Sequence, residues 1–231
     1  MSVAKARIIG VVYLVYFVAA VGGALIAPGT GPSAPPTDAA TSANNILSHE
    51  TSYELGIALG VLSVVLYVAL TALFYVLLRP VNRTLALVMA FINLVAMAVV
   101  AFDSVLLLAP VVVLGGSSYL NVFDPKQLQA LALLFLHISS EAGRVALAFS
   151  GFFQIVWGYL IFRSTFLPRV IGVLIAVAGV GWLTYLWPAQ PAFLVAPTEV
   201  LGFAAEASLM LWLLVMGVNA ARWTERAARA A

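Results

Sequence analysis

Six long apolar runs alternate with short polar connections along the chain. They cover about residues 8–27, 55–78, 84–109, 128–162, 170–187 and 198–219. A bilayer core of about 30 Å needs about 20 apolar residues per helix, and each spanning helix must satisfy its own backbone polar groups. The pattern predicts an all-α integral membrane protein. We expect a six-transmembrane-helix bundle in which residues 1–231 form one transmembrane domain.

The connections carry recognisable turn and capping signals. The segment from Pro28 to Ser52 is rich in Pro, Gly, Ser and Thr, which predicts an exposed loop with a short interfacial helix after Asp38. Pro110 is expected to end the third span, because proline lacks the N–H that a helix interior needs. Asp124, followed by Pro125 and by Gln127 at the third helical position, predicts a capping box that starts the fourth helix.

Small and uncharged polar residues within the spans indicate helix packing. Glycines recur at four- or seven-residue spacing, which allows close contact between helices. Asn93 and Gln154 lie near mid-span, where an amide usually forms an interhelical hydrogen bond. The glycine pairs are Gly56 with Gly60, Gly151 with Gly158, and Gly172 with Gly179.

Composition agrees with this class of protein and excludes others. Hydrophobic residues make up 64% of the chain and charged residues 9%, and the mean hydropathy is +1.09. Cysteine is absent, which excludes disulfides, thiolate metal sites and cysteine nucleophiles. The basic residues lie at span ends rather than in a patch, so no nucleic-acid partner is predicted. The expected partner is the lipid bilayer, and no cofactor is predicted.

Basic residues accumulate on one side of the predicted spans. Cytoplasmic flanks are enriched in Lys and Arg, so this side is predicted to be cytoplasmic, with both termini. Only Lys126 falls on the other side, and Arg144 lies inside a span. The nine cytoplasmic residues are Lys5, Arg7, Arg79, Arg83, Arg163, Arg169, Arg222, Arg226 and Arg229.

A few ionisable side chains within the spans are candidates for function, because a charge at mid-bilayer costs about 2.5 to 3.5 kcal/mol. Counted from the cytoplasmic ends, all of them fall in the outer half of the membrane or at its outer surface. His137, Glu141 and Arg144 share one helix face at i, i+4 and i+7. The candidate cluster is Asp103, His137, Glu141, Arg144 and Glu206.

Three interpretations of this cluster stay open. The cluster could line a pocket for binding or transport of a cation or small molecule. It could instead form closed ion pairs in a structural or assembly protein, with Arg144 paired to Glu206 or Asp103. His137 and Glu141 could also ligate a metal in an intramembrane hydrolase, although no metal-ligand motif such as HExxH is present. The sequence specifies neither a catalytic residue nor an oligomeric state.

Several stretches of the chain resemble one family of bacterial multi-pass membrane proteins, catalogued as domain of unknown function 4386. They are ARIIGVVYL at 6–14, LLRPVNRTLAL at 77–87, FDPKQLQALA at 123–132, GYLIFRSTFLPRVIGVL at 158–174 and LWLLVMGVN at 211–219. The resemblance implies a six-helix bundle in a bacterial plasma membrane. It implies no activity and no site residues.

Overall fold

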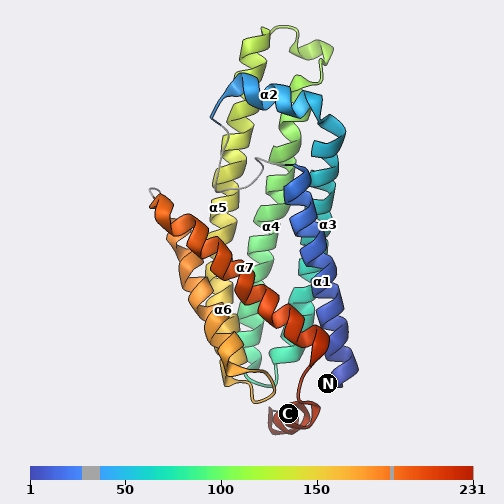
Figure 1. Cartoon of the computed structure of the whole chain (residues 1–231), viewed down its shortest axis with the longest axis vertical. Coiled ribbons are helices and arrows are strands. Elements are labelled where there is room, and N and C mark those ends of the chain that lie inside the picture. The colour runs from blue at the N-terminus through green and yellow to red at the C-terminus, as the bar shows by residue number, and fades with distance from the viewer. Residues whose placement is uncertain (28–36, 188–189, 231) are drawn as a thin grey trace. The chain divides into compact units, whose positions relative to one another are not determined.

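The computed structural model describes residues 1–27, 37–187 and 190–230, and the regular elements within these ranges are helical (Figure 1). The long helices are α1 (Val3–Ile26), α3 (Glu50–Leu78), α4 (Arg83–Leu114), α5 (Pro125–Arg163), α6 (Arg169–Trp182) and α7 (Ala192–Val215). The shorter ones are α2 (Ala39–Ser48), η1 (Ser118–Leu120), η2 (Leu183–Leu186) and α8 (Ala220–Ala230). Among the described residues, six segments, with α6 and η2 counted as one, are long and apolar enough to cross a membrane. The predicted all-α class and the six spans are therefore confirmed.

The outward faces of these helices suit contact with lipid. Between 28% and 50% of the most apolar window of each span is buried inside the protein. Large apolar side chains such as Val18, Val65 and Phe91 are 60% exposed or more. Apolar surface on this scale requires an apolar solvent, which a bilayer supplies.

The predicted break at Pro110 is wrong, because α4 continues through this residue to Leu114. Pro110 deprives the carbonyl oxygen of Leu106 of its helical partner and disturbs its neighbours. The hydroxyl of Tyr53 donates to the neighbouring carbonyl oxygen of Leu107 at 2.9 Å. A neighbouring helix can satisfy carbonyls in this way, so proline is tolerated inside a membrane helix. Gly116, with φ of +72°, follows the actual end of α4.

The capping signals are confirmed, while some span boundaries move. The backbone N–H of Gln127 donates to Asp124 Oδ1 and that of Asp124 to Gln127 Oε1, each at 2.9 Å, so the predicted capping box starts α5 at Pro125. The predicted helix after Asp38 is α2. The last span ends at Val215 rather than at residue 219, since Gly217 with φ of +69° turns the chain. The segment after it forms α8, which the hydropathy pattern does not predict.

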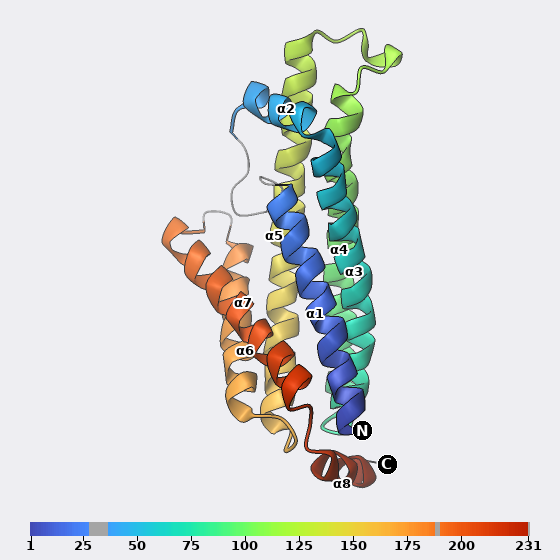
Figure 2. The ribbon, with the colours of Figure 1, turned by 45° about the vertical axis from the view of Figure 1, so that its right-hand side comes forward.

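The described residues divide into two compact units. Unit 1 contains residues 1–16, 66–97 and 145–231, and unit 2 contains residues 17–65 and 98–144. Four helices, α1, α3, α4 and α5, contribute to both units because each passes from one to the other along its length. Figure 2 shows that both chain termini, which belong to unit 1, lie at the same end of that unit.

The core of unit 1 is aromatic. Tyr13, Phe74, Phe153 and Trp157 are almost completely buried, and the rings of Phe153 and Trp157 stack with centroids 5.0 Å apart. Phe74 continues this cluster, with its ring centroid 4.7 Å from that of Trp157. Such ring pairs add about 0.5 to 1.5 kcal/mol each beyond the area they bury, so they hold parts of α1, α3 and α5 together.

Glycines set the contact between α5 and α6 in unit 1, as their spacing predicts. A Cβ atom added to Gly158 would lie 2.5 Å from the carbonyl oxygen of Gly172, and one added to Gly151 would lie 2.9 Å from that of Gly179. No side chain fits between the two backbones at these points. The predicted packing role of these two glycine pairs is therefore confirmed.

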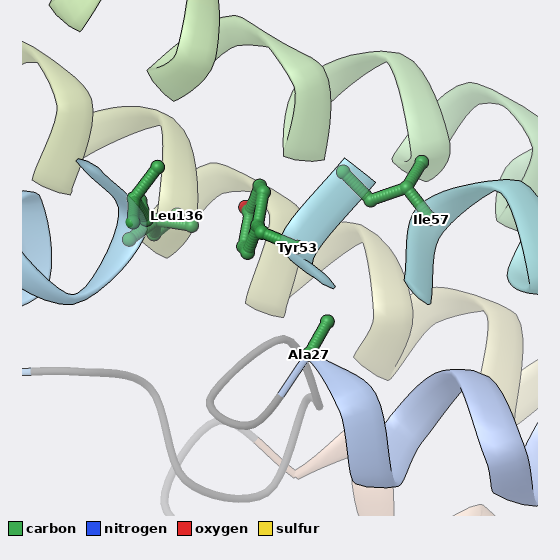
Figure 3. Close-up of a cluster of buried hydrophobic side chains, with 5 residues drawn as sticks. Ala27, Tyr53, Ile57 and Leu136 are labelled. Atoms are coloured by element: carbon green, nitrogen blue, oxygen red, sulfur yellow. The ribbon is translucent and has the colours of Figure 1, made fainter. Parts of the chain in front are cut away.

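The core of unit 2 is formed where four helices meet. Ala27 at the end of α1, Ile46 of α2, Tyr53 and Ile57 of α3, and Leu136 of α5 are each 6% exposed or less (Figure 3). In Figure 1, α2 runs across the direction of the α3, α4 and α5 segments of this unit. The transverse α2 thus closes the apolar cluster at one end of unit 2.

Candidate functional site

Glu206 lies in unit 1 within a network of hydrogen bonds. The hydroxyl of Tyr13 donates to Glu206 Oε2 at 2.7 Å, and that of Tyr67 donates to the same oxygen at 3.4 Å. Gln154 Nε2 donates to Glu206 Oε1 at 2.8 Å. These donors come from α1, α3 and α5, so the carboxyl group of α7 ties four helices together. Both carboxyl oxygens gain partners, as a buried polar group needs.

The amides predicted to form interhelical hydrogen bonds do so. Gln154 bonds to α7 as described above, and Asn93 Nδ2 of α4 donates to Thr71 Oγ1 of α3 at 2.5 Å. Asn93 and Thr71 are both buried. Their role in unit 1 is therefore helix packing, as expected.

Asp103 lies in unit 2 on α4 and is half-buried. Its carboxyl group forms a side-chain hydrogen bond with the hydroxyl of Ser139 on α5. Its Oδ1 atom is buried and has no hydrogen-bond partner within the described part of the chain. An unsatisfied buried carboxylate oxygen is costly and calls for an explanation.

The α5 face that carries His137, Glu141 and Arg144 lies partly on the surface of unit 2. His137 and Glu141 are exposed, and the side chain of Glu141 is 74% exposed. Arg144 Nε lies 3.7 Å from Glu141 Oε2, one helical turn away. The structure therefore brings Glu141 and Arg144 together as a pair, with an exposed carboxylate and a partly buried guanidinium group. Since Glu206 belongs to unit 1 and the other four candidates to unit 2, convergence of all five stays a prediction.

The described residues do not form a metal-binding site around His137 and Glu141. No group of three or more His, Cys, Asp or Glu side chains lies close enough to hold a metal ion in ranges 1–27, 37–187 and 190–230. His137 and Glu141 have the helical spacing of a ligand pair, but the described residues supply no third ligand.

Unit 2 also contains a cavity of about 570 Å³. One part of its wall is apolar and comes from the end of α1, from Ile46 and from Leu136. Tyr53 adds an aromatic ring, and four polar side chains complete the wall. They are Ser42, Asn45, His49 and Ser52. Leu25 is 76% exposed and His49 is exposed as well, so the cavity opens at the surface.

The cavity and Asp103 are neighbours along two helices. Tyr53 of the cavity wall donates to Leu107, which follows Asp103 by one helical turn on α4. Leu136 of the wall precedes Ser139, the partner of Asp103, by one turn on α5. The unpartnered carboxylate oxygen therefore belongs to the layer of unit 2 next to the cavity.

Charge is distributed unevenly between the two units. Unit 2 contains six carboxylates against Lys126 and Arg144, a formal charge of −4. Unit 1 contains nine basic residues against Glu199, Glu206 and Glu225, a formal charge of +6, which accounts for the +2 of the whole chain. The net charge of unit 2 as a whole therefore favours a cation over an anion.

Sequence reasoning identified Asp103 and Glu206 but not their surroundings. Tyr13 and Tyr67 are 193 and 139 residues from Glu206, and no local pattern links them to it. The described cavity wall comes mainly from residues 25–27 and 42–53, and only Leu136 of α5 is distant from them in sequence. The sequence offers one signal, which is the presence of tyrosines within apolar runs. A tyrosine buried there usually needs a hydrogen-bond partner for its hydroxyl group.

Comparison with known proteins assigns a family. No curated protein and no solved structure is significantly similar to this chain. A family model described as a domain of unknown function (DUF4386) matches residues 8–217, which include every candidate residue above. Since this match covers most of the 231 residues, the chain belongs to the DUF4386 family.

Proposed function

We propose that this chain binds a small amphipathic cation in the cavity of unit 2. The observation that carries the proposal is the composition of the cavity wall. Sites for small molecules are typically concave, about 300 to 1,000 Å³ in volume, and mostly apolar with a few polar groups. At about 570 Å³, this cavity has the size and the mixed wall of such a site.

Three features support a positive charge on the ligand. Unit 2 has a formal charge of −4. Asp103 has a buried carboxylate oxygen without a partner among the described residues, in the layer beside the cavity. Tyr53 contributes an aromatic ring to the wall, and the face of such a ring attracts cations.

The proposal includes the orientation of the chain in a bacterial plasma membrane. An even number of spans supports both termini on one side, and the basic residues at the ends of the unit 1 helices support a cytoplasmic location for them. About 20 residues of α4 counted from Arg83 reach Asp103, and about 20 of α5 counted backwards from Arg163 reach Gly143. His137, Glu141 and the cavity would then lie at or beyond the outer edge of the hydrocarbon core.

The absence of cysteine makes this orientation easy to test. Single-cysteine variants Ser2→Cys, Ala228→Cys and Ser117→Cys are treated in intact cells with a maleimide that cannot cross the membrane. We expect labelling of the Ser117→Cys protein alone, and labelling of all three after the cells are opened. Labelling of the terminal variants in intact cells would show that the termini face outward and would refute the proposed orientation.

Ligand binding is tested with two probes of similar size and opposite charge, tetraphenylphosphonium and tetraphenylborate. Equilibrium dialysis against the protein in nanodiscs, with empty nanodiscs subtracted, should give saturable binding of the phosphonium only. Ser52→Phe fills the cavity and should weaken binding at least tenfold. Thr51→Phe, which adds the same ring at an exposed neighbouring position outside the cavity wall, should leave binding unchanged.

The carboxylate of Asp103 is tested separately. Asp103→Asn removes the carboxylate in the layer beside the cavity and should weaken phosphonium binding at least tenfold, which corresponds to about 1.4 kcal/mol. Glu54→Gln removes one negative charge from an exposed position of the same unit and should cost less than threefold. Equal binding of the two probes, or equal effects of the two variants, would refute the cation site.

A second candidate is a structural or assembly role for the polar residues, and the network around Glu206 favours it. This carboxyl group has hydrogen-bond donors from three other helices. If Glu206 only stabilises the fold, Glu206→Gln lowers thermal stability and leaves phosphonium binding at its wild-type value. Retained binding in that variant would thus separate the two roles.

A further inference from the structure

The C-terminal helix α8 presents a basic face. Glu225, Arg226 and Arg229 follow Arg222 at i+3, i+4 and i+7, so the four share one side of the helix. Together with Thr165 they line a groove of about 200 Å³ in unit 1. Three guanidinium groups and one carboxylate give this groove a net positive charge.

Specific contacts hold α8 in place, so the groove is not formed by a loose tail. The Trp223 indole N–H donates to the carbonyl oxygen of Leu77 at the end of α3 at 2.9 Å. Arg222 donates through a guanidinium nitrogen to the carbonyl oxygen of Thr165 at 3.1 Å. Asn219 caps the helix by accepting from the backbone N–H of Arg222 at 3.1 Å.

The groove lies at the end of unit 1 where the membrane helices stop. Thr165 belongs to the turn between α5 and α6, Leu77 to the end of α3, and α8 follows α7 after the turn at Gly217. Figure 2 shows α8 below these helix ends and transverse to them. A short helix with one basic face beside the ends of spanning helices has the composition of an interfacial helix that meets anionic lipid.

The arginines of the groove are unequally available to a ligand. Arg229 already pairs with Glu225 one turn away. Arg226 lies between them on the same face, and Arg222 uses one guanidinium nitrogen for Thr165 and keeps its other donors. A guanidinium group binds phosphate oxygens in a bidentate manner, so Arg222 and Arg226 are the principal candidates to hold a phosphate.

We propose that the groove of α8, through Arg222 and Arg226, binds the phosphate group of an anionic phospholipid. The proposal is independent of the cavity in unit 2 and of the ligand assigned to it. Binding can be measured on purified protein, so the test does not depend on which side of the membrane α8 occupies.

The test uses the full chain purified in a non-ionic detergent. Its ligands are short-chain phosphatidylglycerol, short-chain phosphatidylcholine and inorganic phosphate, with dissociation constants from native mass spectrometry. We expect binding of phosphatidylglycerol in preference to the other two. Each arginine near a lipid surface contributes about fivefold, so the double variant R222Q/R226Q should bind phosphatidylglycerol about 30-fold more weakly.

The matched control is R79Q/R83Q, which removes one arginine from the turn between α3 and α4 and one from the first position of α4 in the same unit. It should change the dissociation constant less than threefold. An equal loss in both double variants would reduce the site to diffuse surface charge and overturn the proposal. Binding of inorganic phosphate as tight as that of phosphatidylglycerol would also overturn it, since the groove would then recognise a free anion.

Because a loss of binding could also result from misfolding, the test includes a variant that is expected to bind the lipid more tightly. Glu225→Gln removes the one carboxylate among the described residues that line the groove and releases Arg229 from its ion pair. We expect phosphatidylglycerol to bind this variant several-fold more tightly than the wild type. Unchanged or weaker binding would contradict the assigned groove.

Discussion

Replacement of Gly158 by alanine places a methyl group in space that the backbone of α6 occupies. The new Cβ atom would lie 2.5 Å from the carbonyl oxygen of Gly172 and 2.6 Å from the backbone nitrogen of Ala176. Neither atom can rotate away as the end of a side chain could. The variant therefore forces α5 and α6 apart within unit 1.

The size of the effect follows from two opposing terms. Overpacking of a close contact costs about 1 to 3 kcal/mol, and backbone clashes place this site at the upper end of that range. Alanine in place of glycine within a helix returns up to about 1 kcal/mol. The net loss for Gly158→Ala is about 2 kcal/mol. Gly60→Ala has no atom within 4 Å of its new Cβ, so it keeps only the gain of about 0.5 to 1 kcal/mol.

The assay is thermal unfolding in detergent, followed by the fluorescence of the five tryptophans. At about 2 to 4 °C per kcal/mol, Gly158→Ala should lower the midpoint by about 4 to 8 °C, and Gly60→Ala should raise it slightly. Gly172→Ala meets the same contact from the other side, so the double variant should lose less than the sum of the two single losses. A Gly158→Ala protein as stable as the wild type would refute this packing of α5 on α6.

Three further changes test individual contacts. Tyr13→Phe removes a 2.7 Å hydrogen bond to Glu206 and should destabilise the protein by about 1.5 to 3 kcal/mol in the same unfolding assay. Trp223→Phe loses a 2.9 Å hydrogen bond that docks α8, which should raise the mobility of a spin label on α8. Hydrogen bonds from Thr41 hold the pKa of Asp38 below its ordinary value, so the cap of α2 is stable above that value and is lost as pH falls through the lowered pKa. A spin label on α2 should gain mobility there, and Asp38→Ala should abolish the pH response.

The sequence predicts the spanning helices well because lipid imposes a simple requirement. Long apolar runs give the six spans, and their number agrees with the structure. The spacing of Gly151 and Gly158 predicts close helix packing, because small residues are what such packing needs, and the structure gives α6 as the partner helix. Asp124 and Gln127 predict the start of α5, because a capping box is a local interaction.

Features that depend on distant partners are not predicted. Pro110 favours a helix end locally, but Tyr53 from another helix supplies a hydrogen bond beside it, and α4 continues. A search for apolar runs does not find α8, because its sequence is short and polar. Contacts with distant residues, such as that between Trp223 and Leu77, hold this helix in place. For the same reason the sequence identifies Glu206 as a candidate but does not give its tyrosine partners.

The 3₁₀ turn η2 has a consequence for the thickness of membrane that this protein matches. Helix α6 has only 14 residues, about 21 Å, and the four residues of η2 bring the segment to about 29 Å. This is close to the hydrocarbon thickness of an average bilayer, whereas α5 with 39 residues is far longer. Hydrophobic mismatch therefore acts first on the span from Arg169 to Leu186. Lipids with longer acyl chains should strain this span before any other, so the protein should lose stability as the hydrocarbon core thickens beyond about 30 Å.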